Sequence, residues 1–249
     1  MGWPTHIGRF AIEAHDSLVT TQDPANALSE AGRVDVVVVA ERQTGGRGRR
    51  GRAWTSPVGN LYASTVIAPP REKALVPCAS LVVAVAMAEA VERLGVASDR
   101  LRLKWPNDVL LDDGKVAGIL IDYVAERLVV GTGLNVQERP DDPPNARTLR
   151  DAGVDVTAEA ALRSFLLCLA ARLEVLDDVG FGPAREAWLG RAAGLGAPLR
   201  ARVGGRMIEG TQHGIDEAGA LQIETAEGLR TINAGDVELV RLAATGTTS

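Results

Sequence analysis

Four consecutive valines stand inside residues 34–40, whose sequence is VDVVVVA. β-branched side chains favour extended backbone, and an unbroken apolar run of this length is typical of a strand buried within a sheet. We therefore predict a buried strand here, followed by a loop rich in Gly and Arg. Further strands are predicted at residues 61–67, 115–123 and 127–136, the last two joined by a tight connection at Ala125 and Glu126.

Apolar residues recur at helical spacing in two long segments. Residues 75–94 form the first, with Gly95 as a stop signal, and residues 157–178 form the second. Thr157 is a candidate N-cap, and Glu159 lies in the first turn, where a negative charge is favourable. A shorter helix is predicted at residues 183–192. Only about thirty residues precede the first predicted strand, which is too few for a separate winged-helix domain.

The composition changes after Gly194, Leu195 and Gly196. Residues 198–242 contain only short strand-like runs punctuated by Gly, Asn and Asp, a spacing typical of a small β-barrel of roughly 45 residues. We therefore divide the chain into a first domain at residues 1–195, a β-barrel domain at residues 196–243 and a tail at residues 244–249. The tail is rich in Thr and Gly and is expected to be disordered.

The net charge of −5, from 27 Lys and Arg against 32 Asp and Glu, argues against a general nucleic-acid binder. The two cysteines, Cys78 and Cys168, lie in apolar helical stretches, so buried thiols are expected rather than metal ligands or a disulfide. No secretory leader and no apolar run of membrane-spanning length is found, so a reducing cytoplasm is the expected location.

Residues 41–54 carry five arginines and four glycines in fourteen positions. Glycine allows the backbone to approach a ligand closely, and successive N–H groups in such a turn can bind an anion. Arginine supplies a charged planar fork that matches phosphate and carboxylate. The segment predicts a loop that closes over an anionic ligand, with Trp54 stacked on a ring or covering an apolar chain. On composition alone, a flexible basic loop that binds nucleic acid or nothing specific is an equal alternative.

A second motif, LKWPNDV, follows between two strand-like runs. Pro106 lacks an N–H and restricts Trp105 to extended backbone, so a turn with fixed side-chain directions is predicted. Lys104 offers a charge for a phosphate, and Asn107 can both donate to and accept from a purine edge. Asp108 suits Mg²⁺, which prefers one or two carboxylates together with phosphate oxygens. The alternative is a structural Asn-Asp turn.

Lys115 opens a predicted strand directly after a turn signature. Such a lysine is either a solvated edge charge or points into a site, where it stabilises a carboxylate or acyl-phosphate oxygen. Gly118, inside the same strand, indicates close approach by a ligand or another backbone. The run GTGLNV, which contains Asn135, has the same character.

These motifs, in their order along the chain, resemble the biotin–protein ligase family. The matching segments are GRGRRGRAW at residues 46–54, KWPNDV at 104–109, GKVAGIL at 114–120 and GTGLNV at 131–136, and the resemblance covers roughly residues 5–242. It implies an α+β fold of the class II synthetase-like kind, a mixed β-sheet flanked by helices, followed by a small SH3-like β-barrel.

The resemblance implies a ligase that works in two steps. Biotin and MgATP would first give biotinyl-5′-adenylate and pyrophosphate, and a lysine of a biotin carboxyl carrier protein would then attack the mixed anhydride. The small molecules implied are biotin, ATP and Mg²⁺. The first domain would bind biotin and ATP. The enzyme is expected to be a cytoplasmic monomer or homodimer that binds neither DNA nor membranes directly.

Roles for individual residues follow from the same resemblance. Arg47 and Arg49 would clamp the biotin carboxylate and the α-phosphate, and Lys115 would polarise the acyl or phosphate oxygen, so these three are the expected catalytic residues. Asp108 would hold Mg²⁺. The expected biotin-binding residues are Thr20, Thr21, Gln22, Gln43, Gly46, Arg47, Gly48, Arg49, Trp54, Lys115 and Gly118. The expected ATP-binding residues are Arg49, Arg52, Trp54, Lys104, Asn107 and Asn135.

One segment departs from the family pattern, which usually has a Ser-Thr-Asn motif near the N-terminus that hydrogen-bonds the biotin ureido group. Thr20, Thr21 and Gln22 keep the order of hydroxyl, hydroxyl and amide. Asp16 and Ser17 give a competing alignment, in which the Thr-Asn part is lost. We prefer the first alignment because its distance to the Arg/Gly loop matches.

Three other functions stay open at this stage. A lipoate–protein ligase or octanoyltransferase shares the fold, although the loop motifs favour biotin and neither cysteine suits a nucleophile. A nucleic-acid-binding module would need basic grooves and stacking aromatics, which the negative charge and the 4% aromatic content oppose. A homologue that only binds biotin is opposed by the presence of Arg47, Arg49, Lys104 and Lys115.

Overall fold

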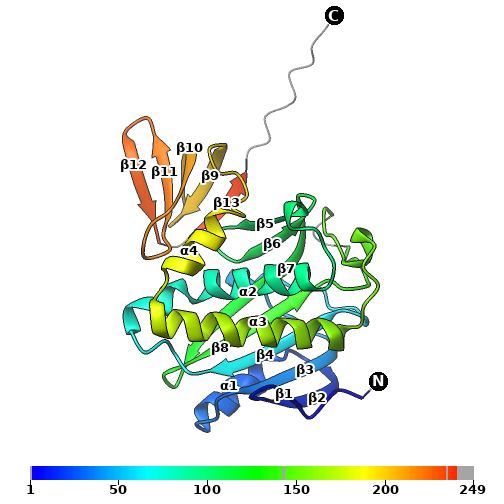
Figure 1. Cartoon of the computed structure of the whole chain (residues 1–249). Helices are drawn as coiled ribbons and strands as arrows, with labels where there is room; N and C mark the ends of the chain where they lie inside the picture. Colours follow the sequence, from blue (N-terminus) through cyan, green and yellow to red (C-terminus); the bar gives the residue numbers. More distant parts are fainter. Residues whose placement is uncertain (1, 142–143, 234, 240–249) are drawn as a thin grey trace, which may run out of the picture.

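A mixed sheet of eight strands forms the larger part of the molecule (Figure 1). The computed structural model describes residues 2–141, 144–233 and 235–239. The strand order is β1-β2-β3-β4-β8-β7-β6-β5, and only β2 and β3 pair in parallel. The strands are β1 (His6–Ile7), β2 (Phe10–Leu18), β3 (Val36–Gln43), β4 (Leu61–Ile67), β5 (Leu101–Lys104), β6 (Asp108–Leu111), β7 (Gly114–Val124) and β8 (Arg127–Leu134).

The four valines of β3 lie in the centre of this sheet and are buried on both faces. Val37 and Val39 belong to the main core, on the face covered by the helices α2 and α3 (Figure 1). Val36 and Val38 point the other way and pack with Ala25 of α1. The helices are α1 (Gln22–Glu30), α2 (Ala79–Arg93), α3 (Ala158–Val179) and α4 (Gly182–Leu189), and the 3-10 turns are Arg49–Gly51, Lys73–Cys78, Ser98–Arg100 and Arg150–Ala152.

Several predicted elements agree closely with the structure. The strand at residues 61–67 has the predicted bounds, and the hairpin between β7 and β8 turns at Ala125 and Glu126, both with positive φ. Thr157 caps α3, since its side chain accepts a hydrogen bond from the Ala160 N–H at 3.2 Å. The predicted α+β class, with a mixed sheet flanked by helices, is confirmed.

The first thirty residues contain three elements that the sequence analysis did not predict: the two-residue strand β1, the strand β2 and the helix α1. Strand β2 is half exposed along most of its length, and α1 has only nine residues. Neither shows a strong apolar period, because β2 lies near the edge of the sheet and α1 buries few side chains, among them Ala25 and Ser29. The long apolar segment at residues 75–94 is also divided, into a 3-10 turn containing Pro77 and α2.

The C-terminal part is a five-stranded antiparallel sheet, which agrees with the predicted small SH3-like domain, although its described strands do not close into a barrel. Its order is β12-β11-β10-β9-β13, and within residues 198–233 and 235–239 the outer strands β12 and β13 do not pair with each other. Closure requires such pairing, so the part is a small SH3-like sheet with open edges. Its strands are β9 (Pro198–Val203), β10 (Arg206–Ile215), β11 (Leu221–Thr225), β12 (Gly228–Ile232) and β13 (Asp236–Leu239). The predicted tail at 244–249 lies outside the described residues.

The second sheet is anchored to the first part by side-chain hydrogen bonds to its backbone. The indole of Trp105 donates to the Gly219 carbonyl at 3.1 Å, and Arg185 of α4 donates to the Ile215 carbonyl at 2.8 Å. Trp105 is buried, so this bond lies in the interior of the junction. The two parts are therefore joined through the turn between β5 and β6, which also carries Lys104 and Asn107.

One helical stretch, Lys73–Arg93, is long and apolar enough to cross a membrane, with a mean hydropathy of 2.1 over its best window. This corrects our expectation that no run of such length exists. The fold accounts for the apolar character, because 67% of that window is buried and α2 packs against α3, α4 and the sheet. The hydrophobic core of the domain is formed around this helix.

Candidate active site

A cavity of about 670 Å³ lies on the sheet face that carries α1. Ser64, Gly131 and Gly133 line it, and in alternating strands these positions share a face with Val66 and Val129, which pack against α1. The Arg/Gly loop forms one wall, and Val237, Glu238 and Leu239 of β13 contribute from the second sheet. The predicted site residues that line the cavity are Thr20, Thr21, Gln22, Gln43, Arg47, Gly48, Arg49, Arg52, Trp54, Lys104, Asn107, Asp108, Lys115 and Gly118.

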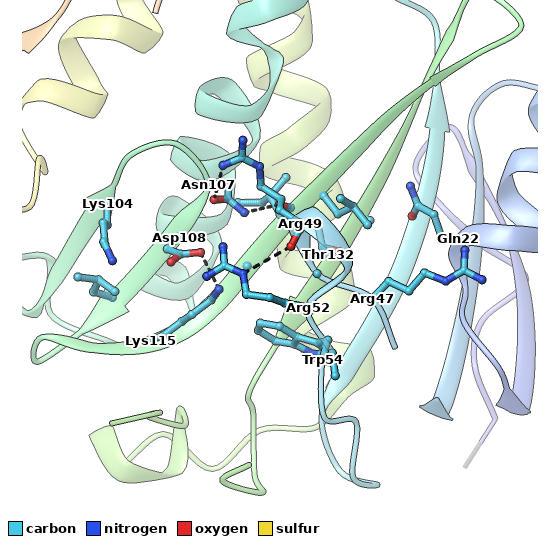
Figure 2. Close-up of a pocket in the computed structure, with 18 of the residues that line it drawn as sticks. Gln22, Arg47, Arg49, Arg52, Trp54, Lys104, Asn107, Asp108, Lys115 and Thr132 are labelled. Atoms are coloured by element: carbon cyan, nitrogen blue, oxygen red, sulfur yellow. Dashed lines mark hydrogen bonds and ion pairs between the residues drawn. The ribbon is translucent and has the colours of Figure 1, made fainter. Parts of the chain in front are cut away.

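The predicted residues divide between two ends of the cavity (Figure 2). Lys104, Asp108 and Lys115 lie at one end, and Gln22 lies toward the other beside Arg47, with Trp54 between them. One end therefore holds a cluster of charged side chains, and the other holds buried uncharged polar groups with the half-exposed ion pair of Arg47 and Asp23 beside them. Such a division suits an elongated ligand with a polar ring at one end and an anionic group at the other.

The uncharged end is a buried hydrogen-bond network around Thr21. The Thr21 N–H donates to Gln43 Oε1 at 2.8 Å, and Thr21 Oγ1 lies 2.8 Å from Ser64 Oγ. Ser64 Oγ donates in turn to Gln22 Oε1 at 2.8 Å. Thr20 Oγ1 accepts from the Gln22 N–H at 3.2 Å, which places all three residues of the Thr-Thr-Gln segment at this end.

The middle of the cavity is formed by Trp54, whose indole lies against strands β7 and β8. It fits because the facing residues are Gly118 and Gly133, which pair across the two strands. A Cβ at Gly133 would lie 2.5 Å from Trp54 Cε2, and one at Gly118 would lie 3.0 Å from Cζ3. The glycines of the GKVAGIL and GTGLNV motifs thus make room for an aromatic side chain. Lys115 Nζ lies 5.1 Å from the centre of the indole, within cation–π range.

At the charged end, Lys115 Nζ forms an ion pair with Asp108 Oδ1 at 2.7 Å. The β5–β6 hairpin positions Asp108, because Lys104 and Asp108 are register partners there. Asn107 donates from Nδ2 to the Ile119 carbonyl at 2.7 Å, so its side chain is held against β7. Lys115 is therefore not a solvated edge charge, and the LKWPNDV motif brings its polar side chains to the cavity.

The Arg/Gly loop is folded back on itself as a narrow hairpin. The Trp54 N–H donates to the Gly46 carbonyl at 2.9 Å, and the Gly48 N–H donates to the Arg52 carbonyl at 2.7 Å. Arg47 forms a two-point ion pair with Asp23 at 2.8 Å, with both side chains about half exposed. Exposed pairs of this kind contribute little free energy, so a ligand can displace Asp23 from Arg47.

Arg49 is the arginine that enters the cavity wall most deeply. Its Nη1 makes two long contacts of 3.5 Å, to Asn107 Oδ1 and to the Gly235 carbonyl. Burial removes water from the guanidinium and lowers its pKa, and the nearby Asp236 carboxylate opposes this shift. The side chain stays charged at neutral pH because the ordinary pKa of a guanidinium is far higher. An anion in the cavity would supply the shorter partners that Arg49 lacks among the described residues.

Two further arginines connect the loop to the second sheet through one carboxylate. Arg50 pairs with Asp236 Oδ2 at 2.8 Å, and Arg52 pairs with Asp236 Oδ1 at 3.1 Å. Asp236 thus holds the loop against β13.

An Asp236→Ala variant is expected to open this contact and expose the arginines of the loop to trypsin. Cleavage within residues 47–52 of the native protein should accelerate roughly three- to tenfold, because each partly exposed ion pair contributes about 0–1 kcal/mol and cleavage follows the population of the open loop. Mass spectrometry of a timed digest measures this rate. Glu209→Ala, which removes an exposed ion pair with Arg200 on the same sheet, is the matched control. Equal cleavage in the two variants would show that Asp236 does not hold the loop.

Two predicted site residues do not line the cavity. Asn135 is 1% exposed, and its amide donates to the Arg147 carbonyl at 3.1 Å, so it supports the backbone instead of facing a nucleotide. Gly46 lies in the neck of the loop, where a Cβ would collide with the Trp54 carbonyl oxygen. The competing segment of Asp16 and Ser17 is exposed on β2 and lies outside the cavity lining.

The structure also brings in residues that sequence reasoning missed. Ser64 and its neighbour Thr65 are buried hydroxyls in the largely apolar strand LYASTVI, and buried polar side chains in such a strand could have indicated a site. Thr132 and Gly131 were inside a quoted motif but received no role. Glu238 and Leu239 lie some two hundred residues away from the loop in sequence, and nothing local in β13 indicates that it reaches the cavity.

Neither cysteine is placed to act as a nucleophile. Burial raises the pKa of the Cys78 thiol to about 11, with a smaller contribution from the Asp216 carboxylate, and Cys78 Sγ donates to the Ala218 carbonyl at 3.3 Å. Burial also raises the pKa of Cys168, which lies on α3. Only the thiolate is a strong nucleophile, and neither residue lines the cavity. The predicted buried thiols are confirmed.

Comparison with known proteins gives consistent matches along the chain. The sequence model of the biotin/lipoate A/B protein ligase family matches residues 20–137, and that of the biotin protein ligase C-terminal domain matches residues 194–240. The bifunctional ligase/repressor BirA of Bacillus subtilis (strain 168) is 34% identical over 252 aligned residues, which span 96% of this chain and 77% of that protein. The biotin–[acetyl-CoA-carboxylase] ligase of Paracoccus denitrificans is 39% identical over 213 residues, spanning 80% of this chain and 88% of that protein.

A solved structure gives the same match in three dimensions. The biotin protein ligase from Aquifex aeolicus in complex with biotin and ATP superposes with a TM-score of 0.82 at 30% sequence identity. The superposition covers 93% of this chain and 99% of that one.

Proposed function

The chain belongs to the biotin/lipoate A/B protein ligase family, and from this premise we propose that it is a biotin–protein ligase. It activates biotin with ATP and transfers it to a lysine of a biotin carboxyl carrier protein. The observation that carries the proposal is the cavity itself. An uncharged polar end, an indole in the middle and a cationic end lie in the order of the ureido ring, the aliphatic chain and the carboxylate of biotin.

The first step joins the biotin carboxylate to the α-phosphate of ATP. A carboxylate oxygen attacks the α-phosphorus, the bond from that phosphorus to the bridging oxygen breaks, and pyrophosphate leaves with the electron pair. Negative charge is concentrated at the transferring phosphate, and Arg49 and Lys115, which both line the cavity, would stabilise it. Arg47, which pairs with Asp23 beside Gln22, would have to leave that pair and turn toward the middle of the cavity to bind the carboxylate of biotin.

The second step transfers the acyl group to the carrier. The neutral amine of the acceptor lysine attacks the acyl carbon, the bond to the phosphate oxygen breaks, and AMP leaves. An ordinary lysine has a pKa of about 10.4, so the amine must lose a proton to solvent or to the carrier before attack, and the nitrogen loses a second proton to solvent as the amide forms. Between the two steps, the Arg/Gly loop, which Asp236 holds against β13, would keep water from the adenylate.

Magnesium fits this site only together with the nucleotide. Among the described residues no group of three His, Cys, Asp or Glu side chains is close enough to hold a metal. Asp108 supplies one carboxylate, and its ion pair with Lys115 uses a single oxygen. Mg²⁺ accepts such a set, since it commonly binds one or two carboxylates with phosphate oxygens and water. Asp108 would therefore hold the ion, which when bound neutralises charge on the leaving pyrophosphate.

Lys104, Arg52 and Asn107 would contact the nucleotide, and residues 1–195 would form the catalytic domain with residues 196–243 closing its loop side. The acceptor is the carrier protein or domain of a biotin-dependent carboxylase, consistent with the names of the Paracoccus and Mycobacterium tuberculosis relatives. We propose that the enzyme acts in the cytoplasm, as a monomer or homodimer, and that neither DNA nor a membrane takes part in the reaction.

Pyrophosphate release tests the proposed function most directly. The purified chain with MgATP is expected to release pyrophosphate with biotin, and much more slowly with lipoate or octanoate. Adding a carboxyl carrier domain should transfer biotin to its acceptor lysine, detected by mass. Release with lipoate or octanoate in place of biotin would assign the chain to the lipoyl branch of its family. Biotin binding without pyrophosphate release would indicate a protein that only binds biotin.

A further inference from the structure

Asp122, on β7, lies behind the uncharged end of the cavity without lining it. Its Oδ2 accepts from Gln22 Nε2 at 3.0 Å and from Asn26 Nδ2 at 3.4 Å. Gln22 Nε2 also donates to the Val129 carbonyl at 3.1 Å, so both of its hydrogens face acceptors on the side away from Ser64. The Gln22 carbonyl oxygen accepts from Ser64 Oγ on the other side.

These contacts allow one orientation of the Gln22 amide. If the amide were turned over, Gln22 Oε1 would face the Asp122 carboxylate and the Val129 carbonyl, and acceptor would meet acceptor. Hydrogen-bond partners decide between the two orientations of an amide. Here the charged Asp122 carboxylate and the neutral Val129 carbonyl both favour the orientation in which Gln22 Nε2 faces them. The position of the amide is further defined by Gly131, where a Cβ would lie 2.5 Å from Gln22 Oε1.

The orientation has a consequence for the hydroxyl groups next to it. Thr21 Oγ1 and Ser64 Oγ take part in three contacts, to Gln43 Oε1, to each other and to Gln22 Oε1. Each contact needs one donated proton. The two hydroxyl groups have two protons between them, so one of the three contacts has no proton to donate. A turned-over Gln22 would donate to Ser64 and remove the shortage. The observed orientation therefore leaves this end of the cavity rich in acceptors.

We propose that Asp122 is a positioning residue that holds the Gln22 amide with its oxygen toward the cavity, and thereby selects a ligand ring that presents N–H donors. This inference rests on the proposed function, in which the ring is the ureido ring of biotin. A ring or chain without N–H groups cannot supply the missing proton, so the acceptor-rich end disfavours it through unsatisfied buried oxygens.

Kinetics of the full-length enzyme test the proposal through Asp122→Ala. We expect the KM for biotin to rise about tenfold, as for the loss of one well-placed buried hydrogen bond. The kcat and the KM for ATP should change less than twofold, because Asp122 touches neither the reacting atoms nor the charged end. Asp178→Ala removes an exposed carboxylate at the end of α3 and controls for the change in net charge.

A double-mutant cycle with Gln22→Ala decides whether Asp122 acts through Gln22. In the Gln22→Ala background, Asp122→Ala is expected to add less than a twofold further rise in the KM for biotin. Additive effects, or equal losses for biotin and ATP, would overturn the proposal and leave Asp122 as an anchor of α1. Thermal unfolding of each variant identifies any loss of folded protein. Failure of the unmodified enzyme to use biotin would instead refute the proposed function.

Discussion

An Arg49→Ala variant is expected to release pyrophosphate in the presence of biotin about 10²–10³ times more slowly than the unmodified enzyme. Removing one group aimed at developing charge in a closed site typically costs this much in rate. Arg49 lies in the cavity wall, and among the residues that the structure describes its side chain makes only long contacts of 3.5 Å, so its donors are available to a ligand. The loss should fall on kcat, since the charge on the transferring phosphate is greatest in the transition state. Single-turnover measurement of pyrophosphate separates this step from release of product.

Two further variants test whether the loss in Arg49→Ala comes from the guanidinium group at this position. Arg49→Lys keeps the charge but loses the planar fork, and we expect it to recover only part of the rate because a bidentate contact is lost. Arg200→Ala removes an arginine whose ion pair with Glu209 is exposed on the second sheet, and it should leave the rate unchanged. A loss below threefold in Arg49→Ala would exclude Arg49 from the chemistry, and would assign stabilisation of the phosphate to Lys115 alone.

The residues of the site were largely predictable because its motifs are local and chemically unusual. Arginines and glycines dominate the loop, and a tryptophan, a proline, an asparagine and an aspartate follow one another in the second motif. The sequence did not predict which of these residues would contact one another across the strands. The ion pair between Lys115 and Asp108, and the stacking of Trp54 on Gly118 and Gly133, depend on strand register, which a local pattern does not define.

The errors in the predicted fold have the same cause, because a local sequence pattern can identify an element but not how it pairs or packs. The central strand β3 is buried on both faces and has an unmistakable composition, whereas α1 derives its stability from the sheet it covers. Closure of the C-terminal strands into a barrel depends on whether β12 meets β13, and strand spacing alone gives no information on that. Asp236 is the first residue of β13, and only the packing of β13 against the Arg/Gly loop gives its carboxylate a role.

A Gly133→Ala variant is expected to lower kcat/KM for biotin roughly ten- to hundredfold. The new methyl group would lie 2.5 Å from Trp54 Cε2 and 2.6 Å from Cζ2. A rigid indole cannot absorb this overlap by changing a distant torsion, so the whole ring must move into the cavity. Overpacking of this kind costs about 1–3 kcal/mol, and 1.4 kcal/mol corresponds to about tenfold in an equilibrium constant. Displacement would also separate Trp54 from Lys115, which stacks on its face.

Removing the indole should remove the penalty. In a Trp54→Ala background, Gly133→Ala is expected to change kcat/KM less than twofold, because the space that the methyl group needs is then free. Gly182→Ala is the matched control, since a Cβ there meets nothing within 4 Å. If Gly133→Ala were equally damaging with and without Trp54, the glycine would be needed for direct approach of the ligand to β8, and the indole would not be the wall of the biotin channel. If it were harmless in both, the cavity would have to bind its ligand away from β7 and β8, contrary to the placement of Lys115.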